Sequence, residues 1–136
     1  MVTISATYEG DLCCTAVHGP SNATLHTDAP RDNEGLGRYF SPTDLVATAL
    51  ATCVLTTMGI VARRRGIALE RASARVEKHM IDNPRRIGRL PVEVTMPGAY
   101  DDEQRKVLER AAHGCPVHRS LHPDIDAPIT FVWQPA

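Results

Sequence analysis

Residues 41–53, Ser-Pro-Thr-Asp-Leu-Val-Ala-Thr-Ala-Leu-Ala-Thr-Cys, begin the best-defined element of this chain. Ser41 is a favourable N-cap residue, and Pro42 suits the first helical position because it has no N–H to leave unpaired. Asp44 places a carboxylate in the first turn, where the helix dipole is positive. The segment therefore predicts a helix that begins at Pro42.

The apolar residues that follow extend the same helix. Small and apolar side chains recur at helical intervals from Leu45 to Val61. The arginines at 63–65 favour the negative end of the helix dipole, and Gly66 is a natural residue to follow a helix end. A helix of residues 42–65 is roughly 36 Å long. Because nearly all of its faces are small or apolar, we expect burial on most sides and assign it as the central core helix.

Extended segments precede the helix. Residues 2–8 are rich in β-branched and aromatic residues, and turn signals separate them from the segments 12–18 and 23–27. This pattern predicts three strands in an antiparallel meander. Residues 28–40 combine Gly, Pro and charge without periodicity, which is typical of a loop that carries functional groups.

Two strands, two helices and a last strand are expected after the core helix. Residues 68–80 and 87–96 alternate apolar and polar side chains around an Asp-Asn-Pro turn, which predicts a hairpin. Residues 101–113 have one apolar side and predict an amphipathic helix. A short helix over 115–121 has its proline at the first position, and residues 128–133 predict the final strand.

The composition is typical of one globular domain. A chain of 136 residues has the usual size of a single domain, so we assign residues 1–136 to one domain. The formal charge is −1, whereas nucleic-acid binding demands a clustered basic excess, so nucleic acid is excluded as a partner. No run approaches about 18 consecutive apolar residues, and residues 1–5 lack the features of a signal peptide. We therefore expect a cytoplasmic protein that does not enter a membrane.

Two of the four cysteines occupy positions where a thiol can do chemistry. Cys115 lies at the start of the short helix, where unpaired N–H groups and the positive dipole end favour a thiolate, although a small buried packing residue is the competing interpretation. Cys53 lies in the apolar stripe, where burial raises its pKa and keeps it inert. It becomes reactive only beside a buried cation that a carboxylate holds. Residues 31–44 offer two arginines and two carboxylates for such a pair, namely Arg31, Arg38, Glu34 and Asp44.

Cys13 and Cys14 have a different interpretation. They are adjacent on a predicted strand, so their side chains point to opposite faces. A disulfide between neighbours is strained, and all four cysteines are expected to be thiols in a reducing compartment. We interpret this pair as structural.

Residues 41–53 and the later Cys115-Pro116-Val117, taken together, resemble the OsmC/Ohr family of osmotically inducible and organic hydroperoxide resistance proteins. Members of that family carry one cysteine within the long central helix and another before a proline. The resemblance covers nearly the whole chain in the order of its elements. It implies an α+β OsmC-like fold, with antiparallel sheets around the long helix, in an interlocked homodimer with sites at the interface.

The same resemblance implies a thiol peroxidase that reduces organic hydroperoxides in preference to hydrogen peroxide. Cys53 is then the peroxidatic residue, and its sulfenic acid condenses with Cys115 to a disulfide that an external dithiol reduces. The deep position of Cys53 suits an organic hydroperoxide, and the N-cap thiol of Cys115 suits the resolving role. No cofactor is expected. The alternative is a non-catalytic OsmC-like protein that senses redox state or binds an apolar ligand.

One position departs from the pattern of the Ohr branch. That branch carries a glutamate directly after the proline of the helix start, to hold the active-site arginine, whereas this chain has Thr43 there and Asp44 next. Arg38 is the leading candidate for the arginine because it closely precedes the helix, and Arg31 is the second. Asp44 is the candidate to replace the glutamate. The chain therefore resembles a divergent OsmC-like branch.

The region around Cys115 also contains several residues of the types that bind metal ions. Cys115, His118 and His122, with His113 just before them, form a loose set of possible ligands. Their spacing departs from zinc signatures, and no second pair of ligands accompanies them. We expect no metal site and interpret the histidines as surface or capping residues, with His118 one turn from the Cys115 thiol.

Overall fold

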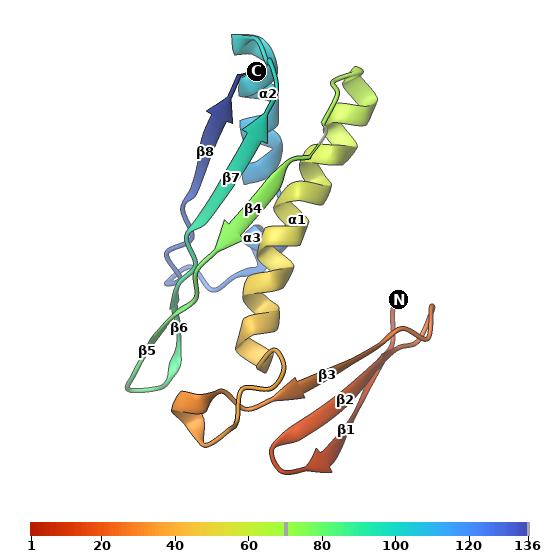
Figure 1. The fold of residues 1–136 in the computed structure, drawn as a ribbon, viewed down its shortest axis with the longest axis vertical. Coiled ribbons are helices and arrows are strands. Elements are labelled where there is room, and N and C mark those ends of the chain that lie inside the picture. Colours follow the sequence, from red (N-terminus) through yellow and green to blue (C-terminus); the bar gives the residue numbers. More distant parts are fainter. Residues whose placement is uncertain (70, 136) are drawn as a thin grey trace. The chain divides into compact units, whose positions relative to one another are not determined.

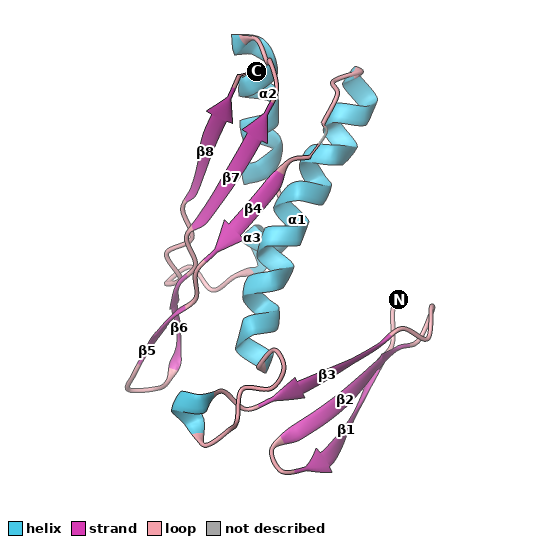
Figure 2. Ribbon diagram, in the orientation of Figure 1, coloured by secondary structure: helices cyan, strands magenta, loops and turns pink. Residues whose placement is uncertain are grey.

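The computed structural model describes residues 1–69 and 71–135, and its elements are drawn in Figures 1 and 2. The chain forms two compact units, Met1–Val46 and Ala47–Ala136. The helix α1 begins at the end of the first unit and continues into the second. The single domain predicted over residues 1–136 stays a prediction.

The first unit is a three-stranded antiparallel sheet followed by a loop. Its strands are β1 (Ile4–Gly10), β2 (Cys13–His18) and β3 (Thr24–Asp28), in the order β1-β2-β3. The predicted meander is confirmed. The loop carries a short 3-10 helix, η1 (Arg31–Asn33), and returns to the sheet, where the N–H of Asp28 donates to the carbonyl of Phe40 at 3.2 Å.

Helix α1 spans Pro42–Arg65, as the sequence predicts. The predicted burial on most sides is wrong, because one stripe of the helix is buried and Ile60 on another side is 48% exposed. The buried stripe consists of Ala47, Leu50, Ala51, Val54, Met58 and Ala62. A single chain thus leaves much of this apolar helix uncovered.

By length and composition, α1 is also apolar enough to cross a membrane, with a mean hydropathy of 2.0 over 18 residues. The core helix of a soluble protein has the same property. The count of uninterrupted apolar residues did not reveal this, since threonines divide the run.

The second unit holds two further sheets. Strands β4 (Ser73–Val76), β7 (Val92–Pro97) and β8 (Ile129–Gln134) form one sheet in the order β4-β7-β8. The β4–β7 pair is antiparallel, but β7 and β8 pair in parallel, which corrects the expectation of purely antiparallel sheets. The segment between β7 and β8 contains two helices, and such a crossover permits parallel pairing. The predicted hairpin is confirmed at its tip as β5 (His79–Ile81) and β6 (Arg86–Arg89).

Helices α2 (Asp102–His113) and α3 (Pro116–Ser120) fill the segment between β7 and β8, as predicted. Asp101 caps α2, since its side chain accepts the Gln104 N–H while the Gln104 side chain accepts the Asp101 N–H. Buried side chains of α1, β7 and α2 form the core of this unit. The largest fully buried side chains among them are Leu50, Val54, Met58, Val92, Val94, Met96 and Leu108.

Candidate active site

Cys53 lies in the middle of α1, beside the buried stripe, and its side chain is half-buried. Helical geometry places residues four apart on one face. Thr57 is therefore one turn further along, and its Oγ1 lies 3.8 Å from the Cys53 sulfur. The sulfur thus faces a hydroxyl of its own helix.

Cys115 is fully buried at the junction of α2 and α3. Its backbone N–H donates to the carbonyl of Ala112 at 3.3 Å, which ties it to the last turn of α2. Its sulfur accepts the N–H of His118 at 3.4 Å as the N-cap of α3. The predicted N-cap position of Cys115 is confirmed.

Cys53 and Cys115 lie near enough for each side chain to act on the pKa of the other. Hydrogen bonding with the Cys115 side chain, the Val117 N–H and the Thr57 hydroxyl, whose Oγ1 lies 3.8 Å from the sulfur, acts on Cys53. Burial raises the pKa of Cys53, but these three hydrogen bonds favour its charged form and together hold the pKa below the ordinary thiol value. A thiolate at Cys53 therefore has donors already in place.

The pKa of Cys115 shifts in the opposite direction. Burial raises its pKa, and so does its hydrogen bond to Cys53, although the N–H of His118 lowers it. The net direction is upward. The argument that an N-cap favours a Cys115 thiolate is therefore wrong here, because burial and the neighbouring sulfur outweigh the helix end. The pKa of Cys53 is lowered by hydrogen bonding and not by a buried cation, and the reactivity of Cys53 stays a prediction.

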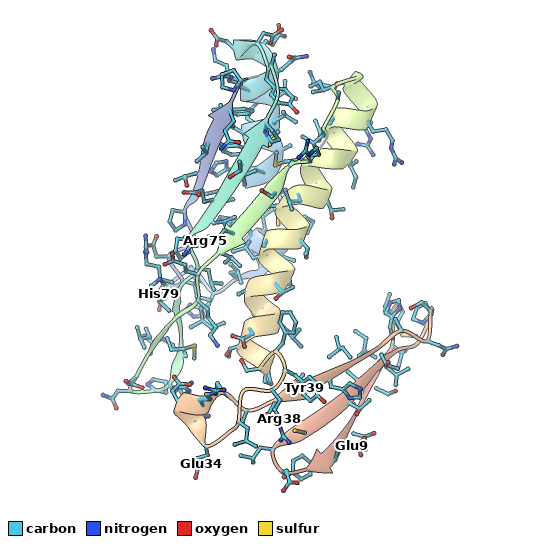
Figure 3. All side chains as sticks on the ribbon, viewed as in Figure 1. Glu9, Glu34, Arg38, Tyr39, Arg75 and His79 are labelled. Atoms are coloured by element: carbon cyan, nitrogen blue, oxygen red, sulfur yellow. The ribbon has the colours of Figure 1, made fainter. Side chains whose placement is uncertain are left out.

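The candidate arginine lies in the first unit, where it joins a separate cluster (Figure 3). The Nε of Arg38 donates to Asp28 at 2.9 Å, and the Arg38 backbone N–H donates to the same carboxylate oxygen at 3.1 Å. Its Nη2 donates to the Cys13 sulfur at 3.0 Å. The Asp28 side chain is fully buried, whereas that of Arg38 is partly exposed. The carboxylate that the structure places on the guanidinium is thus Asp28, which the sequence patterns did not indicate.

Charge and burial set the titration of this cluster. The hydrogen bonds from Arg38 hold the pKa of Asp28 below its usual range, and the carboxylate raises the pKa of Arg38. Burial raises the pKa of Cys13 even though Arg38 acts in the other direction. The Cys13 thiol is therefore less acidic than an ordinary thiol.

Asp44 and Arg31 form hydrogen bonds with the nearby backbone. Asp44 accepts the N–H of Ser41 at 2.9 Å, and the Ser41 hydroxyl accepts the Asp44 N–H at 3.1 Å. This reciprocal pair closes the start of α1, in the way a capping box does. Arg31 donates its Nε to the carbonyl of Leu36 at 3.2 Å within the loop.

The structure thus places the predicted site residues in two groups, one in each unit. Cys53 and Cys115 meet in the second unit, whereas Arg38 and Asp44 belong to the first. The pairing of Arg38 with Cys53 stays a prediction. Thr57 was missed, although its spacing of four residues from Cys53 was a sequence signal.

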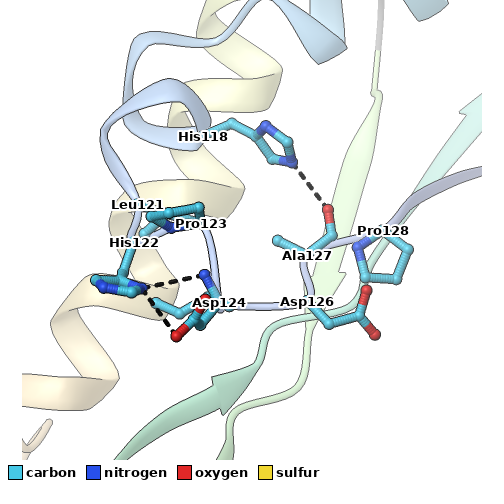
Figure 4. Close-up of a pocket in the computed structure, with 9 residues that line it drawn as sticks. His118, Leu121, His122, Pro123, Asp124, Asp126, Ala127 and Pro128 are labelled. Carbon is cyan, nitrogen blue, oxygen red and sulfur yellow. Dashed lines mark hydrogen bonds and ion pairs between the residues drawn. The ribbon is translucent and has the colours of Figure 1, made fainter.

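A pocket of about 470 Å³ lies beyond α3, next to the histidines considered as metal ligands (Figure 4). The Nε2 of His118 donates to the carbonyl of Ala127 at 2.9 Å, and the Nδ1 of His122 accepts the N–H of Asp124 at 3.0 Å. Farther back, the Nδ1 of His113 donates to the carbonyl of Glu109 at 2.8 Å. Within residues 1–69 and 71–135, no three potential metal ligands lie close enough to share an ion.

Sequence and structure comparisons agree on the kind of protein. A profile of the OsmC-like protein family matches residues 34–129. No curated protein matches the chain by sequence. A crystal structure from Psychrobacter arcticus 273-4, provisionally described as an osmotic stress induced and detoxification response protein, is 43% identical with a TM-score of 0.92, over 97% of this chain and 96% of that one.

More distant structures have the same fold. An OsmC-like protein from Mycoplasma pneumoniae is 16% identical, with a TM-score of 0.83 over 98% of this chain and 97% of that one. An organic hydroperoxide resistance protein from Legionella pneumophila is 20% identical, with a TM-score of 0.73 over 96% of each chain. The family profile covers most of this chain, and the P. arcticus protein matches it along nearly its whole length. The chain therefore belongs to the OsmC-like protein family and has the α+β fold of the OsmC/Ohr proteins.

Proposed function

We propose that this protein is a thiol peroxidase that reduces organic hydroperoxides through Cys53 and Cys115. One observation carries the proposal. Cys53 and Cys115 act on each other's pKa, and hydrogen bonding lowers the pKa of Cys53 while burial and Cys53 raise that of Cys115. One sulfur is thus prepared to attack as a thiolate, and its neighbour stays protonated until it is needed.

The chemistry balances with these two residues and one external dithiol. The Cys53 thiolate attacks the terminal oxygen of the hydroperoxide, the O–O bond breaks, and the alcohol leaves with a proton from solvent, so Cys53 becomes a sulfenic acid. The Cys115 sulfur then attacks Cys53, and water leaves as the disulfide forms. The external dithiol reduces this disulfide and is itself oxidised.

An organic substrate fits the surroundings of Cys53 better than hydrogen peroxide does. The side chains next to Cys53 on the buried stripe are apolar, and Leu50 and Val54 among them are fully buried. Such surroundings favour a substrate with a hydrocarbon portion. The name of the Legionella pneumophila structure, an organic hydroperoxide resistance protein, supports the same substrate class.

A homodimer is part of the proposal. Apolar side chains are exposed on the β1 strand, in the loop before α1 and on α1 itself, among them Ile4, Tyr8, Tyr39, Phe40 and Ile60. Exposed apolar surface of this extent is typical of protein interfaces. We expect sedimentation or light scattering to give twice the mass of one chain, and a monomer at micromolar concentration contradicts this part.

Arg38 and Asp44 are proposed as site residues on the family resemblance alone. If Arg38 supplies charge at the Cys53 sulfur, Arg38→Ala lowers the rate of Cys53 oxidation by cumene hydroperoxide roughly tenfold or more. Arg38→Lys, which keeps the charge but not the planar fork, retains part of that rate. A rate equal to wild type in both variants removes Arg38 from the mechanism.

The decisive experiment is a peroxide titration of the reduced protein. Cumene hydroperoxide and hydrogen peroxide are compared by loss of free thiols, and the new disulfide is located by peptide mass mapping. We expect rapid formation of a Cys53–Cys115 disulfide with the organic peroxide and no turnover by Cys53→Ser with a dithiol present. Cys115→Ser should stop at the sulfenic acid, which dimedone traps. Slow and unselective oxidation, or oxidation confined to Cys13 and Cys14, favours a redox-sensing or ligand-binding protein instead.

A further inference from the structure

Two threonines of α1, Thr52 and Thr57, use their hydroxyl groups in different ways. Thr52 donates its hydroxyl to the carbonyl of Thr48 at 2.8 Å and approaches that of Ala49 at 3.3 Å. This is the usual partner of a threonine inside a helix. Thr57 instead places its Oγ1 3.8 Å from the Cys53 sulfur, on the same face of the helix. Its hydroxyl therefore lies within hydrogen-bonding reach of the thiol, and the geometry lets either group donate.

The donors at the Cys53 sulfur come from two elements and are all uncharged. Cys115 and Val117 supply theirs from the start of α3, and Thr57 supplies its hydroxyl from α1. Cys115 is the titratable group among them, and His118, the ring of which donates to Ala127, is the nearest basic group on α3 in sequence. The Cys115 thiol must give up its proton when it resolves the sulfenic acid, so its donation ends partway through the cycle. The Thr57 hydroxyl keeps its proton throughout.

We infer that Thr57 is a further catalytic residue of this protein, whose hydroxyl donates to the Cys53 thiolate and keeps that sulfur in its attacking form. The inference rests on the proposed peroxidase function. A hydroxyl that donates to a thiolate stabilises the charged form more than the neutral one, since hydrogen bonds to charged groups are the stronger kind.

Substitutions at Thr57 separate the hydroxyl from the shape of the side chain. Thr57→Val keeps the shape and removes the hydroxyl, Thr57→Ser keeps the hydroxyl, and Thr57→Ala removes both methyl and hydroxyl. Thr52→Val is the matched control, because it removes a hydroxyl from the same helix that serves the backbone. The readout is the pH dependence of Cys53 alkylation by iodoacetamide, followed on the Cys53 peptide by mass spectrometry without any peroxide.

We expect Thr57→Val and Thr57→Ala to lower the thiolate fraction of Cys53 at pH 7 roughly three- to tenfold. Thr57→Ser and Thr52→Val should titrate like wild type. The rate of Cys53 sulfenylation by cumene hydroperoxide should fall in parallel. The inference is overturned if valine and alanine leave the titration unchanged, or if serine moves it as far as alanine does. Because alkylation needs no peroxide, failure of the peroxidase proposal appears separately, as a wild-type Cys53 that does not react with hydroperoxides.

Discussion

At Cys53, the sulfur lies among hydrogen-bond donors that two helices supply, and this decides which thiol of the pair carries the charge. The N–H of Val117 and the Thr57 hydroxyl act on Cys53, whereas Cys115 is fully buried and its pKa is raised, so it keeps its proton. Burial acts on both sulfurs in the same direction, so the difference between them comes from hydrogen bonding. A cysteine inside an apolar stripe can therefore be the reactive one.

The rates at which Cys53 and Cys13 are alkylated should differ because their pKa values are shifted in opposite directions. Hydrogen bonds hold the pKa of Cys53 below 9.0, whereas burial raises that of Cys13 above it. Both side chains are half-buried, so access favours neither. As pH falls from 9 to 7, Cys53 should keep its reactivity with iodoacetamide longer than Cys13, and it should be modified several times faster at pH 7. Peptide mapping of short reactions measures this, with urea-unfolded protein as the control in which the two rates converge. Faster modification of Cys13 contradicts the assignment of the thiolate.

A second prediction for a single residue concerns the contribution of Asp28 to the stability of the fold. Its folded-state pKa is depressed below 3.8 by the hydrogen bonds from Arg38, so its contribution to stability is present above that pH and is lost as pH falls through the folded-state pKa. Asp28→Asn should therefore lower the melting temperature by several degrees at pH 7, with a smaller difference from wild type near pH 3. Thermal melts at the two pH values measure it. Glu9→Gln, which removes an exposed carboxylate of the same unit, should change little at either pH. An equal loss for Asp28→Asn at both pH values contradicts the ion-pair account.

Among the elements, those with local signals were predictable and those that depend on distant pairing were not. Ser41, Pro42 and Gly66 mark the ends of α1 in sequence, and the structure begins and ends the helix there. The parallel pairing of β7 with β8 depends on the path of the intervening helices, which alternation along a strand does not encode. The contact between Arg38 and Asp28 depends on how the loop returns to β3, and no short-range spacing of residues predicts it. The Cys53–Cys115 contact was indicated by family resemblance, since nothing in the local pattern joins two residues so far apart.

The start of α2 offers a test at the element scale, because Cys115 follows the far end of this helix as the N-cap of α3. Asp101 satisfies the Gln104 N–H, and removal of such an N-cap usually costs about 1 kcal/mol, within a range of about 0.5–2 kcal/mol. Asp101→Ala should lower the free energy of unfolding by about that amount in urea denaturation. Asp102→Ala is the control, since Asp102 lies within the first turn and loses at most the smaller dipole contribution. Equal losses in the two variants contradict the capping role of Asp101.

At the scale of the whole molecule, the proposed disulfide is expected to stabilise one of the two units and not the other. Cys53 and Cys115 both belong to residues 47–136, so oxidation closes a loop entirely inside the second unit. A loop of about sixty residues restricts the unfolded chain enough to stabilise the folded state by up to about 4 kcal/mol. We expect the peroxide-oxidised protein to unfold at higher urea concentration than the reduced protein. Hydrogen exchange should show the added protection in β4, β7 and α2, which lie inside the loop, and not in β1 or β2, because the first unit lies outside it. Cys115→Ser, treated in the same way, should gain nothing. Equal protection of both units on oxidation contradicts a disulfide confined to residues 47–136, and no gain at all in the oxidised wild type indicates that strain in the bonded pair offsets the loop effect.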